Sequence, residues 1–169
     1  MADGSVLHAS SGPVHVLRYL GEVRYPMAPS LARFVDELLQ QASIPAFVID
    51  LSAVETIDST NLGLLARLAN RLRERGGPRA TIIVDGGELP EVLQTMAFDE
   101  VFDIVREPPP QAETVPTPEP VEIDEYLDRQ AVGQTVLEAH RNLMAMSEHN
   151  REVFEEVVAA FERQDAAND

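Results

Sequence analysis

An almost continuous apolar run, AFVIDL at residues 46–51, stands a few residues before a helical pattern that begins at Leu62. A run of this length without polar alternation is typical of a central strand that is covered on both faces. Such strands belong mainly to parallel sheets, whose neighbouring strands are joined by helical crossovers. The chain is therefore predicted to contain an α/β domain.

The rest of the first half extends this pattern to the order ββαβαβαβ. Two short β-like runs, residues 5–10 and 14–21, flank a Ser-Gly-Pro turn signal and predict a starting hairpin. Apolar stripes at helical spacing follow Pro29 and Asn61 and recur at residues 88–96. Further strands are predicted at 80–84 and 101–105, where apolar residues again run together. This order implies a small mixed, mostly parallel sheet with helices packed against it.

The net charge of −16 excludes several classes of partner. Nucleic acids and anionic membrane surfaces both require clustered positive charge, so neither is expected to bind. All 13 basic residues are arginine, which excludes a P-loop lysine and a Schiff-base lysine. No apolar run approaches the roughly 18–20 residues that span a bilayer, and no signal peptide is recognisable. With no cysteine in the chain, a cytoplasmic protein without membrane insertion is predicted.

A proline-rich segment divides the chain into two unlike parts. Residues 108–120 contain six of the twelve prolines and show no apolar periodicity. We therefore predict an α/β domain at 1–107, an extended proline-rich linker at 108–122 and an acidic helical extension at 123–169. The part before residue 108 carries a net charge of −6 and the part after it −10.

The extension is predicted to contain a long helix from about residue 124 to residue 163. Its heptad-like positions, which alternate steps of four and three residues, are Val136, His140, Leu143, Ser147, Asn150, Phe154, Val157 and Phe161. A solvated helix of this length would be unfavourable, so it should dock on the domain, fold back near Gly133, or pair with a second copy as a homodimer. The stripe suits either ordinary packing or the binding of a partner.

The junction before the second predicted helix gathers four small polar residues, from Asp58 to Asn61. Asp58 is a good N-cap, because its carboxylate can accept hydrogen bonds from the free N–H groups of the first turn. Ser59 comes next, just inside the helix. A phosphate on Ser59 would meet unpaired N–H donors and the positive end of the helix dipole. Capping alone and a reversible phosphorylation switch both remain open from these residues.

Other constellations give no site. Asp50, Glu55, Asp58 and Asp85 follow predicted strand ends, but caps and solvated loop charges explain them without a cation. The four histidines show no pair at ligand spacing, so no metal is predicted. Ser59 lacks the G-x-S-x-G context of a catalytic nucleophile. The sequence therefore predicts no enzyme, no cofactor and no metal centre.

The first half resembles a STAS domain, the fold of bacterial anti-sigma factor antagonists. The resemblance rests on LGEV at 20–23, FVIDLSAVETIDSTNLGLLARL at 47–68 and MAFDEVFDIV at 96–105, and it spans about residues 5–106. The central block is the most specific, because a buried strand is followed by an acid, a serine and a second hydroxyl, and then by LGLL.

The resemblance implies a phosphorylation-gated partner switch. The family's phosphorylatable serine falls on Ser59, and Asp58, Thr60, Asn61 and Gly63 would form the surrounding partner-binding surface. The unphosphorylated form would bind an anti-sigma factor or a related regulator. A serine switch kinase would abolish that complex and a PP2C-type phosphatase would restore it.

The extension and the DSTNLG form resemble a proteobacterial subgroup linked to motility and biofilm formation. This chain departs from the common pattern at Asn61, where many members have glycine, and at Arg24, where they have an acid. An alternative is a STAS subunit of a membrane transport assembly that is not switched. The proline-rich linker and the acidic tail count against that alternative, and an enzyme or small-molecule sensor is less favoured still.

Overall fold

The computed structural model of the chain describes residues 3–124 and 129–168. The described residues follow the predicted ββαβαβαβ order and then add a short strand and two helices. The elements are β1 (Ser5–Ser11), β2 (Val14–Val23), α1 (Ala28–Leu39), β3 (Ala46–Ile57), α2 (Ser59–Glu74), β4 (Thr81–Ile83), α3 (Leu89–Thr95), β5 (Asp103–Val105), β6 (Glu119–Pro120), α4 (Arg129–Met144) and α5 (Glu148–Asn168).

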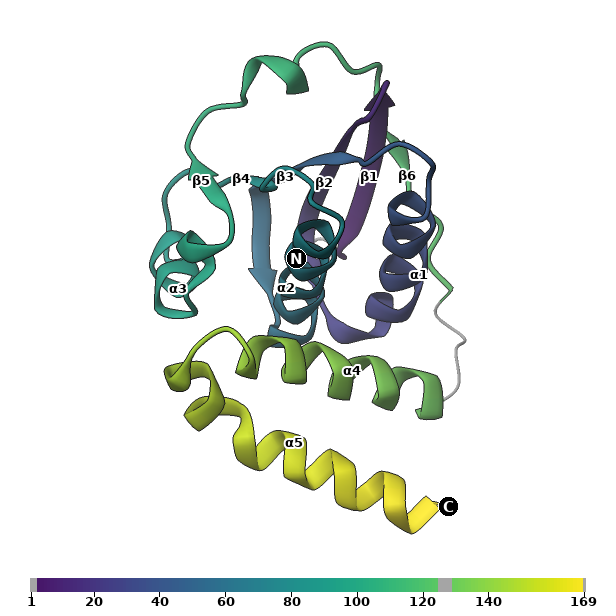
Figure 1. The fold of residues 1–169 in the computed structure, drawn as a ribbon, viewed down its shortest axis with the longest axis vertical. Helices are drawn as coiled ribbons and strands as arrows, with labels where there is room; N and C mark the ends of the chain where they lie inside the picture. The colour runs from purple at the N-terminus through teal and green to yellow at the C-terminus, as the bar shows by residue number, and fades with distance from the viewer. Residues whose placement is uncertain (1–2, 125–128, 169) are drawn as a thin grey trace.

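The strands form one sheet in the order β5-β4-β3-β2-β1-β6. β1 pairs antiparallel with β2 and with β6, whereas β2, β3, β4 and β5 are parallel neighbours. Helices α1 and α2 lie on one face of this sheet, and α4 crosses below their ends (Figure 1). The α/β fold class, with its small, mostly parallel sheet, is therefore confirmed.

Strand β3 is longer than its apolar run predicted. The run ends at Leu51, but the strand continues to Ile57 and delivers the chain directly to Asp58. This second half pairs with β2 only, because β4 pairs with residues 48–50. Two register shifts accompany the pairing, and Gly21 on β2 adopts a positive φ of 71° between them. A strand with one neighbour and partly exposed side chains lacks the continuous apolar signal, which is why the sequence predicted the strand only as far as Leu51.

The main core lies between the sheet and the helices. Fully buried members include Ile49 and Leu51 of β3, Leu65 and Leu72 of α2, and Phe98. A second cluster on the opposite face of the sheet joins Val16, Val48 and Ile83 to Ala112 and Val115. The last two belong to the proline-rich segment, which also supplies β6. The segment therefore contacts the domain through these residues, and β6 lies beside β1 at the edge of the sheet (Figure 1).

The C-terminal extension contains two helices where the heptad pattern suggested one continuous helix. The expected long helix is present as α5, with 21 residues, and α4 precedes it. They separate at residues 145–147, not near Gly133, and the Ser147 hydroxyl caps α5 by accepting the Asn150 N–H at 3.0 Å. α4 packs on α2 and α1. Docking on the domain is thus the arrangement observed for α4, while pairing between copies stays a prediction for α5.

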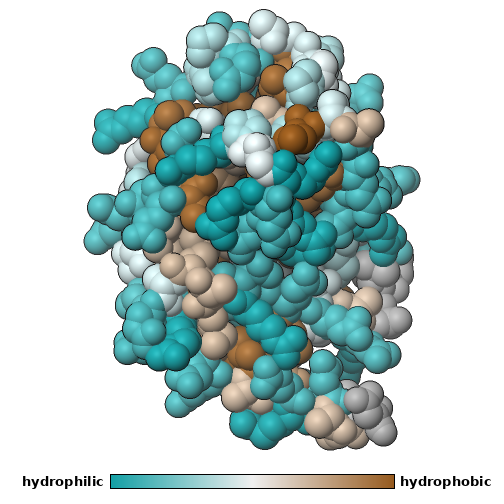
Figure 2. Space-filling model, in the orientation of Figure 1, coloured by the Kyte–Doolittle hydropathy of each residue, from teal (hydrophilic) through white to brown (hydrophobic). Residues whose placement is uncertain are grey.

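Hydrophilic residues cover most of the surface turned toward the viewer in Figure 2, and the apolar residues there form small separate patches. Large exposed apolar side chains of the extension are Val153 and Val157 on α5. No helix in the described part of the chain is both long and apolar enough to cross a membrane.

Two histidines on the hairpin provide a pH-dependence prediction. His8 Nε2 and His15 Nδ1 lie 2.9 Å apart, and burial lowers the pKa of both imidazoles. The charge of His15 lowers the pKa of His8 further, whereas the Gln41 side chain partly offsets the shift of His15. Because the unfolded chain then binds more protons, the free energy of unfolding should fall as the pH drops through about 6.5, the ordinary histidine pKa.

Urea unfolding at pH 7.5 and pH 5.5 measures this loss. The chain with His8→Gln and His15→Gln should lose less stability between the two pH values than the wild type. His149→Gln is the control, because His149 is exposed on α5. An equal loss in the double variant and the wild type would show that the histidine pair does not cause it.

Candidate functional site

The junction between β3 and α2 is organised by Asp58. Its backbone is extended, with φ −84° and ψ 169°, and α2 begins at the next residue. The Asp58 carboxylate accepts from the backbone N–H of Asn61 at 3.0 Å and from the Asn61 side-chain amide at 2.9 Å. The predicted N-cap is therefore confirmed. The second bond gives Asn61 a structural role, because its amide holds the capping carboxylate in place.

Ser59 is the first residue of α2 and is half-buried. Its Oγ lies 2.8 Å from Nε2 of His140, a residue of α4 that is 81 positions away in the sequence. His140 Nδ1 lies 2.7 Å from the Val136 carbonyl oxygen, which can only accept a hydrogen bond. In the neutral ring Nδ1 is thus the donor, and Nε2 accepts from the Ser59 hydroxyl. With this tautomer, the Ser59 hydroxyl donates to a ring nitrogen of the C-terminal extension.

Of the other residues predicted around Ser59, Asp58 is half-buried and the remaining three are buried. Thr60 is 4% exposed and Asn61 1% exposed, and Gly63 is buried as well. A Cβ added to Gly63 would lie 2.3 Å from the carbonyl oxygen of Ala139, so only glycine permits α4 to pass this closely. We call the surface formed by Ser59, Thr60, Asn61 and Gly63 the Ser59 face. The predicted residues are brought together on this face, but it lies beneath α4.

An ionic cluster holds the next turns of α2 to α1 and α4. The Arg67 guanidinium is 2.8 Å from Asp36 on α1 and 2.8 Å from Glu138 on α4. Arg71 adds a 2.9 Å contact to the second oxygen of Asp36. Burial acts to lower the pKa of Arg67, but the hydrogen bond to Asp36 and the attraction of Glu138 outweigh it and raise that pKa. The cluster therefore keeps a buried charge paired while it ties α4 down.

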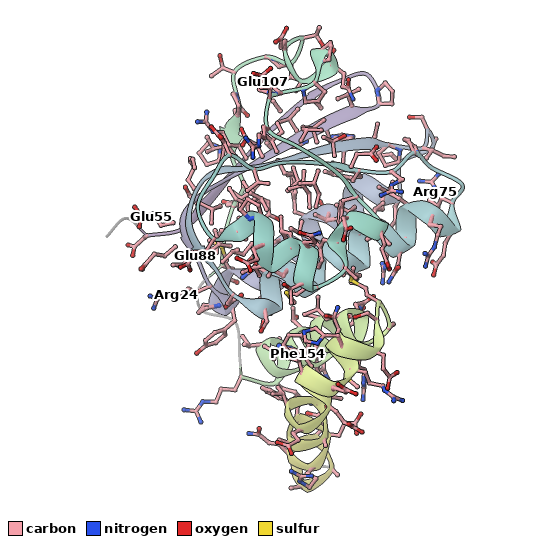
Figure 3. The ribbon with its side chains drawn as sticks, turned by 90° about the vertical axis from the view of Figure 1, so that its left-hand side faces the viewer. Arg24, Glu55, Arg75, Glu88, Glu107 and Phe154 are labelled. Atoms are coloured by element: carbon pink, nitrogen blue, oxygen red, sulfur yellow. The ribbon has the colours of Figure 1, made fainter. Side chains whose placement is uncertain are left out.

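Helix α5 supports α4 from outside. The rings of Phe154 and His140 meet edge to face, with centroids 5.2 Å apart, and Figure 3 labels Phe154 where the two C-terminal helices meet below α2. Arg141 contacts Glu162 at 2.8 Å. The Asn150 amide donates to the Met96 carbonyl at 2.9 Å, which anchors α5 to the domain. The extension is thus fixed to the domain at several points.

Arg24, the other departure from the family pattern, lies apart from these contacts. Its side chain is 63% exposed and pairs with Glu22 at 3.2 Å, near the end of β2. Figure 3 labels Arg24 at the outer edge of the molecule, on the same side as Glu55. The Arg24 side chain is therefore accessible to a partner. In the described part of the chain its ion pair is with Glu22, which is not a residue of the Ser59 face.

Two of the acidic residues at the strand ends, Asp50 and Asp58, have other contacts in the described part of the chain. Within residues 3–124 and 129–168, no three of the histidine, aspartate and glutamate side chains gather closely enough to hold a metal ion. Asp50 instead accepts from the backbone N–H and the hydroxyl of Ser52 and lies 3.9 Å from Arg18.

A cavity of about 920 Å³ opens beside Thr60, between Tyr25 and the outer ends of α4 and α5.

Sequence reasoning missed the residues of the extension that touch this face. His140 was visible only as a polar residue at an apolar heptad position, and such a position signals a specific polar contact. Arg67, Asp36 and Glu138 gave no local signal, because their pairing joins three helices that are distant in the sequence.

Comparison with known proteins gives a consistent result. The crystal structure of an anti-sigma factor antagonist from Mycobacterium paratuberculosis is similar at 26% identity and a TM-score of 0.53, over 62% of this chain and 87% of that one. A candidate anti-sigma factor antagonist from Thermotoga maritima is 21% identical with a TM-score of 0.53, over 59% of this chain and 85% of that one, and this likeness shows the fold alone. No curated protein matches the chain.

The family match covers the α/β domain and leaves the extension outside it. The STAS domain model matches residues 8–108, from β1 to just beyond β5, and α4 and α5 lie after that range. The Ser59 face lies within the matched residues, whereas the helix that covers it does not. With more than half of its length matched, the chain belongs to the STAS domain family.

Proposed function

We propose that this chain is an anti-sigma factor antagonist whose binding is switched by phosphorylation of Ser59. The observation that carries the proposal is the place of Ser59, at the first position of α2 and directly after its aspartate cap, in a STAS domain. The similarity to an anti-sigma factor antagonist at 26% identity supports the same role. The partner is then an anti-sigma factor or a related regulatory protein.

A phosphate on Ser59 would act on binding through its charge. A helix N-terminus tolerates an anion, because its free N–H groups and its dipole stabilise negative charge. The phosphate would nevertheless add about −1.5 to −2 charges beside Asp58. An interface complementary to the neutral serine would have to desolvate or pair that charge, which opposes binding. A serine switch kinase and a PP2C-type phosphatase would move the protein between the two forms.

Phosphorylation is tested first. The full chain, purified from its native cells, should carry one phosphoserine that peptide mass spectrometry assigns to Ser59, and the Ser59→Ala chain should carry none. Ser52→Ala is the matched control, because Ser52 is an exposed serine of β3 with its hydroxyl bonded to Asp50. Phosphorylation of the Ser59→Ala chain to the wild-type level would rule out Ser59 as the switch.

Binding is tested next. A pull-down with Ser59→Ala and Ser59→Asp chains should recover the regulatory partner with the alanine form only. The purified partner should then bind Ser59→Ala at least about tenfold more tightly than Ser59→Asp, which corresponds to about 1.4 kcal/mol. Equal affinities for the two forms would contradict a charge-gated interface at this position.

A further inference from the structure

Helix α4 lies where a protein that recognised the Ser59 face would have to bind. Its buried residues are Val136, Leu137, Ala139, His140 and Leu143, and Leu143 is part of the main core. The backbone of α4 passes directly over Gly63. Thr60, which lies on the same turn of α2, is almost completely buried. The Ser59 face is therefore closed in this conformation.

Three contacts show which groups fit against the Ser59 face and the next turn of α2. At Gly63 the face leaves room for a helix backbone with a small side chain, here that of Ala139. At Ser59 the face fits a side chain that forms a hydrogen bond with the hydroxyl, here His140. Next to the face, at Arg67 on the following turn of α2, a carboxylate is bound, here that of Glu138. All three come from consecutive residues of one helix, so the face is complementary to an α-helix that carries an acid, a small residue and a hydrogen-bonding group in a row.

We propose that α4 is an intramolecular occupant of the Ser59 face, and that a partner binds by placing a helix of the same chemistry where α4 now lies. The inference rests on the proposed function for the identity of that partner as an anti-sigma factor or related regulator. It adds that the antagonist is held closed by its own extension, and that α4 must leave before partner or kinase reaches Ser59.

The closed form lowers the apparent affinity for any partner. If only a fraction of the molecules has α4 displaced, the apparent Kd equals the intrinsic Kd divided by that fraction. α4 is attached to the same chain and therefore competes at a high effective concentration. A change that displaces α4 without altering the Ser59 face should strengthen partner binding by the factor by which it increases the open fraction.

A single thiol reports whether α4 covers the face. The natural chain has no cysteine, so Thr60→Cys places one thiol at a buried position of the face. Its reaction with a disulfide reagent should be slow when α4 is docked. Adding Ala139→Leu, which forces a large side chain against Gly63, should accelerate the reaction at least about tenfold. Ala160→Leu is the matched control on an exposed position of α5 and should leave the rate unchanged.

A second pair of variants changes only one charge each, so the test still works if Ala139→Leu prevents folding. Glu138→Gln weakens the link to Arg67, and Glu152→Gln makes the same charge change on an exposed position of α5. The first should accelerate thiol modification and the second should not. The proposal would be overturned if thiol modification were equally fast in the Thr60→Cys chain alone and in the chains that also carry Ala139→Leu or Glu138→Gln. In that case α4 would not limit access to the face.

Partner affinity separates this inference from the proposed function. The purified partner should bind the Ala139→Leu and Glu138→Gln chains more tightly than the wild type, in the order of their thiol rates, and bind the two controls as it binds the wild type. Faster thiol modification without tighter binding would overturn competition at this face. Equal binding of Ser59→Ala and Ser59→Asp would overturn the switch itself, while the thiol rates would still establish the cover.

Discussion

Gly63→Ala should lower the free energy of unfolding by about 2 kcal/mol, although alanine is the better helix former. The added methyl group would lie 2.3 Å from the oxygen, 2.6 Å from the carbonyl carbon and 2.7 Å from the Cβ of Ala139. Two of these atoms belong to the backbone, so no side-chain rotation relieves the contact and α4 has to move. Because the contact is with backbone, the cost should lie at the upper end of the range for overpacking, about 3 kcal/mol, which exceeds the gain of about 1 kcal/mol in helix propensity.

Gly133→Ala is the same substitution at another helical position, and it should change the free energy of unfolding in the opposite direction. Gly133 lies inside α4, and a Cβ built there has no heavy atom within 4 Å. Only the propensity term remains, so this variant should stabilise the chain by about 1 kcal/mol. Urea denaturation of both variants, followed by circular dichroism, should therefore separate them by about 3 kcal/mol, the sum of these two effects.

The comparison also reports on how α4 is held. If Gly63→Ala stabilised the chain as Gly133→Ala does, α4 would have to approach α2 less closely than the structure shows. The Gly63→Ala chain should in addition show faster hydrogen exchange in α4, because a displaced helix loses the packing that protects its amides. Unchanged exchange in α4 would argue against displacement even if stability fell.

The α/β half could be predicted because its signals are local. The apolar run of β3, the Asp58 cap and the stripe of α2 each depend on residues that are close in the sequence. The length of β3 could not be predicted in the same way. Its second half has a single neighbouring strand and partly exposed side chains, so its residues lack the apolar continuity that marked the first half.

The cover over the Ser59 face could not be predicted, because it depends on contacts between distant segments. The heptad nevertheless contained a partial signal in its three polar interruptions. His140 meets Ser59, Ser147 caps α5, and Asn150 donates to the Met96 carbonyl. Each interruption thus has a specific polar partner, and Ser147 marks the break between α4 and α5. A polar residue in an apolar stripe is better interpreted as a contact to be found than as a defect of the stripe.

This arrangement connects the extension to the proposed function. The STAS match ends at residue 108, yet the best-defined contacts of the Ser59 hydroxyl and of Gly63 come from residues 139 and 140. In the proposed switch, recognition would therefore depend on residues outside the family's domain as well as on those within it. Under the two proposals, the extension would add a layer of control to a switch whose phosphorylated residue lies in the domain.

Asp36→Ala should be the most damaging single change in the ionic cluster, with an expected loss of about 3 kcal/mol in the free energy of unfolding. The Arg67 side chain is only 9% exposed, and Asp36 binds it at 2.8 Å while also binding Arg71 at 2.9 Å. Without Asp36, the buried guanidinium keeps Glu138 alone, whose side chain is 51% exposed. A buried charge that loses its main partner is more costly than the pair was favourable.

Three further variants make this prediction specific. Glu37→Ala removes a neighbouring exposed acid of α1 and should change stability little. Glu138→Gln should cost about 1 kcal/mol or less, because its carboxylate is half in solvent. Arg67→Met combined with Asp36→Ala should recover most of the loss, since it removes the unpaired charge and keeps an apolar stem of similar length. If the double variant were as unstable as Asp36→Ala alone, the cost would come from lost packing, and the paired charge would not be what holds α1, α2 and α4 together.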